Sequence, residues 1–180
     1  PNLPLCHASS RFLTYKRIRR QLLDTNQLPT HILAEQAITP YFQPLFDLNS
    51  GALYGHEALS RGPLDSPLRS PLALFQVAEQ SQRLHQLELL CREKAIAKFA
   101  ELALPGKLFL NVSASLLSSP EHQKGMTLAI LQRLNLAQHN IVMELSEQHK
   151  FEQDGLSHVT IEHYRQMGFK VAIDDLGVGY

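Results

Sequence analysis

Apolar residues recur in two rhythms along this chain of 180 residues. In one long segment they return every three or four positions, which predicts a helix because about 3.6 residues complete a helical turn. The apolar positions of that segment are Leu84, Leu87, Cys91, Ala95, Phe99 and Leu102. Elsewhere the apolar residues form short runs rich in β-branched and aromatic side chains, which predict strands.

Capping and breaking residues delimit the other predicted helices. Ser70 followed by Pro71 indicates a helix start, because serine caps a first turn and proline fits the first helical position. A short helix is predicted over Ile32 to Ile38, where Pro40 stops it. Two further helices are predicted, one opened by Ser119-Pro120-Glu121 and carried by Leu128, Leu131 and Leu134, the other capped by Asp154 and carried by Leu156, Val159, Tyr164 and Met167.

Five short runs predict strands, and their order suggests how the chain is wired. The runs are Tyr41 to Leu48, Ala52 to Glu57, Lys107 to Asn111, Ile141 to Glu144, and Phe169 to Ile173. The turn Asn49-Ser50-Gly51 makes the first two a hairpin. Pro44 predicts a sheet edge or an irregular strand, because proline cannot donate to the ladder. Strands then alternate with helices, so the fold class is α/β with parallel strands, wired as a β/α barrel or a doubly wound sheet.

Composition is typical of one globular domain behind a leader. With 44% hydrophobic and 19% charged residues the chain can bury one sizeable core. The 17 basic and 17 acidic residues give a formal net charge of zero, so we expect no attraction to DNA, RNA or an anionic membrane. Cys6 and Cys91 have no metal-ligand spacing, and no apolar run approaches the roughly 18 residues of a membrane span. No signal peptide begins at Pro1, which favours a cytoplasmic setting.

Residues 1–33 are predicted to form a leader with a basic helix, and residues 34–180 the domain. Tyr15, Ile18 and Leu22 lie at helical spacing among lysines and arginines, and we expect this helix to end by Pro29. A solvated flank is favoured over a nucleic-acid or lipid contact, because isolated charge runs are usually solvated.

Oxygen-bearing side chains close four of the strand-like runs. They are Glu57, Asn111, Glu144, and the adjacent Asp174 and Asp175. The carboxyl ends of parallel strands emerge on one rim, so we expect these side chains to converge there. Oxygen donors without cysteines or paired histidines suit Mg²⁺ or Mn²⁺ better than zinc. Each residue alone has a structural alternative, since Asn111 or Asp174 could cap a turn and Glu144 could be an exposed strand end.

Other catalytic motifs do not fit this sequence. The nine histidines include no HExxH or zinc-finger spacing. Gly177-Val178-Gly179 lacks the third glycine of a dinucleotide fingerprint, and no serine lies in a nucleophile elbow.

Four blocks together resemble the EAL-domain cyclic di-GMP phosphodiesterases of bacterial signalling. The blocks are YFQPLFDLNSGALYGHEALSR (41–61), FLNVS (109–113), MELSE (143–147) and AIDDLGVGY (172–180). The resemblance implies an eight-stranded, TIM-like β/α barrel in which one strand of the opening hairpin runs antiparallel to the others. It implies hydrolysis of cyclic di-GMP to the linear dinucleotide pGpG, with a water activated between two divalent ions, Mg²⁺ or Mn²⁺.

The resemblance also implies a role for individual residues. Glu57, Asn111, Glu144 and Asp174 would hold the first metal ion, and Asp174 with Asp175 would reach the second, so that Glu57, Asp174 and Asp175 are the catalytic acids. Gln43 would lie beside the ligand, and Arg61 would hold a substrate phosphate with its planar fork. Glu147 would steady the metal ligands through hydrogen bonds.

The sequence departs from the family in two substitutions and in length. Leu176 stands where the family has phenylalanine and Val178 where it has threonine, and both changes conserve shape. Residues 34–180 fall short of the roughly 250 residues of a typical barrel, so about the first half of the domain is expected, incomplete at its C-terminus. The family's later lysine near the catalytic water has no counterpart here.

Two explanations of this length stay open, a piece of a longer protein or a half-barrel that cannot work alone. A catalytically inactive cyclic di-GMP receptor, or a regulatory scaffold, is therefore the alternative function. A barrel cut here would leave the run Phe169 to Ile173 as an unpaired edge, so the 180 residues alone are expected to associate. The complete domain is expected to be a monomer or modest homodimer, with other signalling domains in a longer chain.

Overall fold

The computed structural model describes residues 28–113, 125–146 and 156–174. The helices are α2 (Leu28–Ala34), α3 (Pro71–Gln80), α4 (Leu84–Glu101), α5 (Met126–Arg133) and α6 (Leu156–Gln166), with a short 3-10 turn, η2 (Gln138–Asn140). The strands are β1 (Thr39–Phe46), β2 (Leu53–Arg61), β3 (Lys107–Val112), β4 (Ile141–Ser146) and β5 (Lys170–Asp174).

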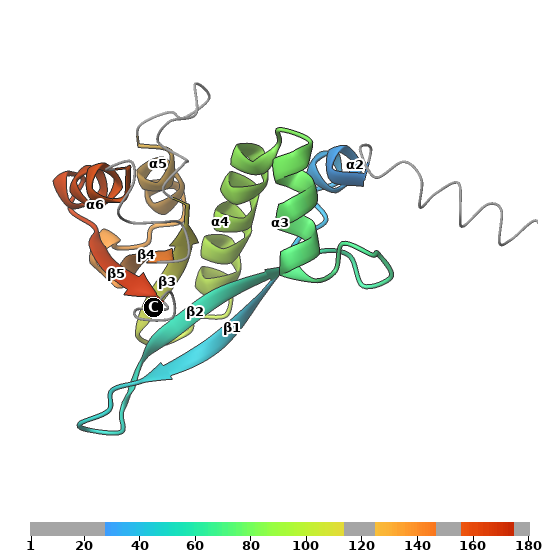
Figure 1. The fold of residues 1–180 in the computed structure, drawn as a ribbon. Helices are drawn as coiled ribbons and strands as arrows, with labels where there is room; N and C mark the ends of the chain where they lie inside the picture. Colours follow the sequence, from blue (N-terminus) through green and yellow to red (C-terminus); the bar gives the residue numbers. More distant parts are fainter. Residues whose placement is uncertain (1–27, 114–124, 147–155, 175–180) are drawn as a thin grey trace, which may run out of the picture.

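The strands form one mixed sheet in the order in which they follow along the chain. The sheet is five-stranded with the order β1-β2-β3-β4-β5. β1 and β2 are antiparallel, whereas the pairs β2 and β3, β3 and β4, and β4 and β5 are parallel. Figure 1 shows the twisted sheet with the β1–β2 hairpin extending away from the helices. The predicted wiring, with one antiparallel strand in the opening hairpin, is confirmed.

The opening hairpin follows from its proline and its turn. β1 lies at one end of the described sheet, so Pro44, which has no N–H to donate, interrupts the ladder with only one neighbouring strand. Asp47 organises the turn, because its Oδ1 accepts hydrogen bonds from Ser50 Oγ (2.8 Å), Ser50 N (2.8 Å) and Asn49 N (3.1 Å). These bonds, that from the Ser50 side chain first, lower the pKa of Asp47. Gly51 closes the turn at φ +68°, a conformation that glycine adopts without strain.

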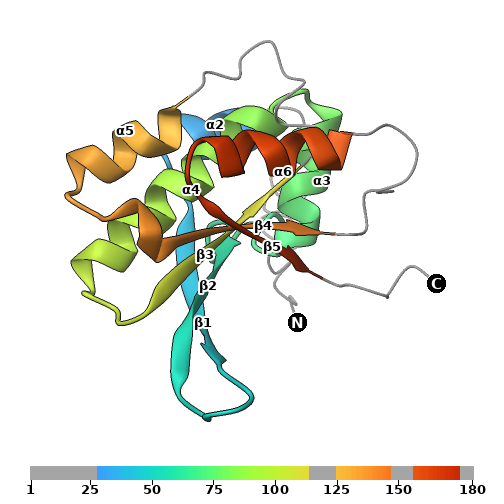
Figure 2. The ribbon, with the colours of Figure 1, turned by 90° about the vertical axis from the view of Figure 1, so that its left-hand side faces the viewer.

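Helices cover one face of the sheet and form the main core with it. Figure 2 shows α4, α5 and α6 together on one side of the strands. The strands contribute Ala58, Leu108, Leu110, Val112, Ile141, Met143 and Leu145 to this core. The helices contribute Ala95, Ile96, Phe99, Ile130, Leu131 and Tyr164, and Phe169 joins them from just before β5. A second cluster joins α2, α3 and the first half of α4.

The structure confirms the helices predicted from the Ser70-Pro71 start and from the three-and-four spacing, which are α3 and α4. Ser70 is the N-cap of α3, where its side chain accepts a hydrogen bond from Ala73 N over 3.3 Å, and Pro71 is the first helical residue. α4 buries Leu87, Cys91, Ala95 and Phe99, as the three-and-four spacing predicts.

Two helix predictions need correction. The helix expected over Ile32 to Ile38 is α2, Leu28–Ala34, so Pro29 lies in a first turn, where its missing N–H costs nothing. The helix ends because Gln36 adopts φ +51°, and the chain then enters β1 before Pro40. On α6, Val159 is 57% exposed, and the fully buried residue is its neighbour Thr160.

Some predictions lie outside the described residues. They are the basic helix of the leader, the Ser119-Pro120-Glu121 segment, the Asp154 cap, Glu147, and the segment from Asp175 onward. The predicted start of the helix that carries Leu128 and Leu131 was wrong, because α5 begins at Met126, after Gly125 at φ +85°. Among the helices that are described, none combines the length and the apolar character needed to cross a bilayer.

Candidate active site on the inner face of the sheet

Strand alternation places the predicted site residues on the face that the helices leave open. Ala58, Leu110 and Met143 point into the helix-covered core. Successive side chains of a strand point to opposite faces, so their neighbours Glu57, Asn111 and Glu144 lie on the other face, here called the inner face.

The strand register extends this set across the whole sheet. Gln43 pairs with Glu57, and Asn111 pairs with Glu144. Asp174 is two residues beyond Ala172, the partner of Glu144, and therefore shares its face. Arg61 is four residues beyond Glu57 and lies on this face too. The structure thus brings Gln43, Glu57, Arg61, Asn111, Glu144 and Asp174 to one face, with Arg61, Asn111 and Asp174 at or near carboxyl ends of their strands.

One hydrogen bond joins two of the predicted metal ligands. Asn111 Nδ2 donates to Glu57 Oε1 over 2.8 Å, although the two residues are 54 positions apart. With its nitrogen engaged as a donor, the Asn111 side chain keeps Oδ1 as an acceptor for a cation. Glu144 is 9% exposed and Asp174 is partly exposed, so solvent exposure of the acids increases from β4 to β5 across the inner face.

Arg61 is held by neutral groups. Its Nη1 donates to the carbonyl oxygen of Ser60 over 3.0 Å, and its Cζ lies 5.9 Å from the centre of the Tyr41 ring. No ion pair of Arg61 with a carboxylate occurs in the part of the chain that the structure describes. Neither of these two described partners neutralises the charge of the guanidinium group.

The donor types fit a hard divalent cation, whereas their spacing fits less well. Carboxylate and amide oxygens are the ligands that Mg²⁺ and Mn²⁺ prefer. Among residues 28–113, 125–146 and 156–174, however, no group of three or more His, Cys, Asp or Glu side chains is compact enough to hold a metal ion. Two further predicted acids, Asp175 and Glu147, lie outside these ranges.

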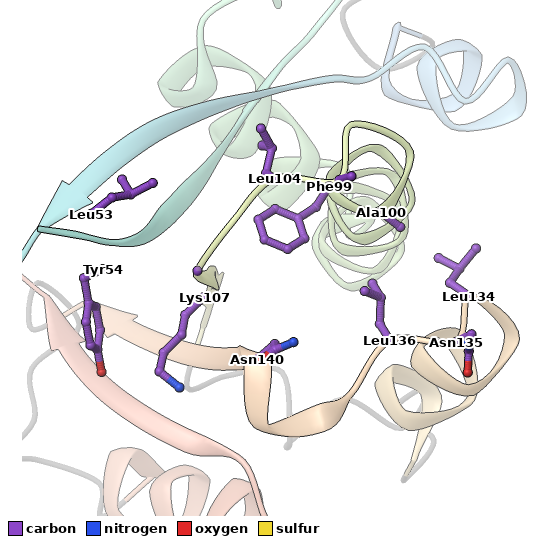
Figure 3. A pocket seen from close by; sticks show the side chains of 12 residues that line it. Leu53, Tyr54, Phe99, Ala100, Leu104, Lys107, Leu134, Asn135, Leu136 and Asn140 are labelled. Atoms are coloured by element: carbon purple, nitrogen blue, oxygen red, sulfur yellow. The ribbon is translucent and has the colours of Figure 1, made fainter.

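A cavity of about 700 Å³ opens at the opposite end of the strands. Its walls come from the starts of β2 and β3 and from the segments at the C-terminal ends of α4 and α5. Figure 3 shows Tyr54 and Lys107 on the strand side of the cavity, and Phe99 and Leu136 on the helix side. Lys107 Nζ donates to the carbonyl oxygen of His139 over 3.1 Å. The active sites of barrel enzymes lie at the carboxyl ends of the strands, so this cavity at the amino ends is not the candidate site.

A second cavity, of about 470 Å³, lies between α3, α4 and the carboxyl-terminal parts of β2 and β3, and Asn111 is among its lining residues. It is lined in part by Arg92, which is 5% exposed and whose Nη1 donates to Thr127 Oγ1 over 2.9 Å. This buried polar contact between α4 and α5 has no sequence signal, because an arginine within a helical pattern is normally expected at the surface.

Comparison with known proteins identifies the family. The sequence matches the profile of the EAL domain over residues 25–180. It is 28% identical over 145 residues to the probable cyclic di-GMP phosphodiesterase PdeI of Escherichia coli K12, covering 77% of this chain and 18% of that protein. It is 29% identical over 164 residues to the cyclic di-GMP phosphodiesterase PdeR of the same organism, covering 88% of this chain and 24% of that protein.

Solved structures share the fold. A standalone EAL protein from Vibrio cholerae O395, bound to cyclic di-GMP, is 31% identical with a TM-score of 0.62, over 78% of this chain and 57% of that one. The FimX EAL domain of Pseudomonas aeruginosa, also bound to cyclic di-GMP, is 19% identical with a TM-score of 0.71, over 86% of this chain and 63% of that one. The chain thus spans under two thirds of each protein compared, and its five strands form part of a TIM-like barrel. The chain belongs to the EAL domain family.

Proposed function

We propose that this domain, in the complete protein, hydrolyses cyclic di-GMP to linear pGpG in a divalent-metal-dependent reaction. The observation that carries the proposal is the inner face, where Glu57 and Asn111 are hydrogen-bonded beside Glu144 and Asp174. The similarity to PdeI and PdeR, both named as cyclic di-GMP phosphodiesterases, supports the reaction class. The similar V. cholerae EAL protein, solved with cyclic di-GMP, supports the ligand.

Substrate binding is assigned to Gln43 and Arg61. The Arg61 guanidinium offers charged donors to a phosphodiester oxygen, and no described acid competes with that oxygen. Gln43 pairs with Glu57 across the hairpin, so a ligand that contacts Gln43 lies beside this acid.

The acids are assigned to two ions of Mg²⁺ or Mn²⁺. Glu57, Asn111, Glu144 and Asp174 would hold the first, Asp174 with Asp175 would reach the second, and Glu147 would orient the ligands. When bound, such ions lower the pKa of a water and offset charge on the phosphate oxygens. The Asn111–Glu57 hydrogen bond prepares for this by fixing both side chains toward one point.

Turnover of cyclic di-GMP by the intact protein tests the proposal. With Mn²⁺ or Mg²⁺ present, chromatography is expected to detect pGpG, and Glu57→Ala and Asp174→Asn are each expected to lower the rate by more than about 100-fold. The matched control is Glu101→Gln, which changes a carboxylate at the end of α4 that pairs with Lys98 at the surface. Undiminished turnover in either site variant would contradict the assigned roles.

A receptor that binds cyclic di-GMP without cleaving it is the second candidate. The placement of Gln43 and Arg61 on the inner face supports this candidate, because both side chains can bind a phosphate without a metal ion. Calorimetric binding of cyclic di-GMP, followed by chromatography of the same sample, separates the two. Binding without pGpG favours the receptor, turnover favours the enzyme, and no binding even with metal favours a regulatory scaffold.

The proposal keeps the remaining expectations from the sequence. We place the reaction in the cytoplasm, in a monomer or modest homodimer that carries other signalling domains. Light scattering of the intact protein, compared with residues 1–180 alone, tests the association state, since β5 pairs only with β4 in the described sheet.

A further inference from the structure

Tyr41 is an aromatic residue that the assigned site does not use, and it lies against the arginine assigned to the substrate phosphate. We propose that Tyr41 is a positioning residue, whose ring holds the Arg61 guanidinium ready for a phosphate of the ligand. This inference rests on the proposed function, because it assumes that Arg61 meets the phosphate. The ring centre is 5.9 Å from Arg61 Cζ, within the range of a cation–π interaction.

The strand register explains why these two side chains meet. Tyr41 pairs with Leu59, and Arg61 pairs with Thr39, so Tyr41 and Arg61 are diagonal neighbours on the inner face. Diagonal pairs of an antiparallel ladder lie within reach of aromatic and long side chains. Gln43 is the next residue of β1 on the same face, which places Tyr41 between the two residues assigned to the ligand.

The chemistry of the contact suits a phosphate-binding arginine. A carboxylate partner would orient the guanidinium but would also neutralise its charge and compete with the phosphate. The Tyr41 ring and the Ser60 carbonyl orient it without removing its charge. Tyr41 is itself 51% exposed, so the face of this pair remains accessible to a ligand. A long side chain that is already ordered loses less conformational entropy on binding. The contact with Tyr41 is therefore expected to increase the affinity for the ligand.

Substitution of the ring tests the proposal in the intact protein. Tyr41→Leu is expected to raise the Kd and the KM for cyclic di-GMP about two- to five-fold with little change in kcat, the size expected for an exposed cation–π contact. Tyr41→Phe keeps the ring and is expected to match the wild type. The control is Phe46→Leu, which removes an aromatic side chain that is 58% exposed at the far end of the same strand.

A double substitution separates positioning from direct contact with the ligand. If Tyr41 acts through Arg61, then Tyr41→Leu is expected to cause no further loss in an Arg61→Met background. Equal affinity of Tyr41→Leu and wild type, an equal loss in Tyr41→Phe, or additive losses in the double variant would each overturn the proposal.

A ligand-free measurement keeps the inference distinct from the proposed function. In NMR spectra of the free protein, the Arg61 side-chain N–H signal is expected to carry a ring-current shift that disappears in Tyr41→Leu and persists in Tyr41→Phe. A wild-type protein that neither binds nor cleaves cyclic di-GMP would refute the proposed function and the phosphate role. An unchanged Arg61 signal in Tyr41→Leu would refute the contact itself.

Discussion

The two faces of the sheet are built from alternate residues of the same strands, yet they differ in chemical character. Leu110 and Met143, on the helix-covered face, are 2% and 0% exposed in the apolar core. Their neighbours Asn111 and Glu144 lie on the inner face with the other predicted ligands. One residue step therefore separates a position that stabilises the fold from a position assigned to chemistry.

The largest effect is expected from the helix-covered face. Leu110→Ala is expected to lower the free energy of unfolding by about 2–5 kcal/mol, because it removes buried methyl groups and leaves a cavity. Urea unfolding measures this change. Leu48→Ala is the control, since Leu48 is 99% exposed in the hairpin turn and its loss is expected to cost under about 0.5 kcal/mol. A small change in Leu110→Ala would mean that this face is not the core.

The adjacent residue is expected to behave in the opposite way. Asn111→Ala removes the hydrogen bond to Glu57 and one of the proposed oxygen ligands, and is expected to lower cyclic di-GMP turnover about 10- to 100-fold. Its free energy of unfolding is expected to stay within about 0.5 kcal/mol of the wild type, because Asn111 is exposed. Loss of stability equal to that of Leu110→Ala would break the comparison between the faces.

The pKa of Cys91 extends the comparison of the two faces, because it depends on how far water reaches the helix-covered side of the sheet. Burial raises the pKa of this thiol from 9.0 to about 11. The folded state therefore keeps the thiol proton to higher pH than the unfolded state does. The contribution of this proton to the free energy of unfolding is complete below pH 9 and is lost as pH rises toward 11.

The corresponding measurement is the stability difference between wild type and Cys91→Ala. Relative to the variant, the wild-type free energy of unfolding is expected to fall by about 1 kcal/mol per pH unit between pH 9 and pH 11. The difference removes the titration of lysines and tyrosines, which both proteins share. Parallel curves through this window would show that the thiol is better solvated than its burial indicates.

Sequence patterns predict the elements of this fold best where local rules decide the structure. The spacing in α4, the Ser70-Pro71 start of α3 and the edge position of the strand with Pro44 all depend on neighbouring residues, and the structure confirms them. The predicted end of α2 was wrong, because Gln36, in a left-handed conformation, ends the helix before Pro40 is reached. The buried Thr160 was missed, because tertiary packing overrides its polarity.

The candidate site depends more on register than on sequence spacing. Strand ends with oxygen donors predict convergence on one rim, and the structure places Gln43, Glu57, Arg61, Asn111, Glu144 and Asp174 on one face. The Asn111–Glu57 hydrogen bond and the Tyr41–Arg61 contact link residues on different strands. Neither follows from the order of residues, since pairing register is set by the whole sheet. The roles of these six residues, and those of Asp175 and Glu147, stay predictions.

Titration of Mn²⁺ into the intact protein tests most directly whether the inner face is a metal-dependent active site. The proposed function predicts that the wild type binds Mn²⁺ and that Glu57→Ala binds it at least about 10-fold more weakly. Glu93→Ala, which removes a carboxylate paired with Arg133 on the outer side of the helices, is expected to bind like the wild type. Equal Mn²⁺ affinity in Glu57→Ala and wild type, or no binding by the wild type, would contradict the assignment.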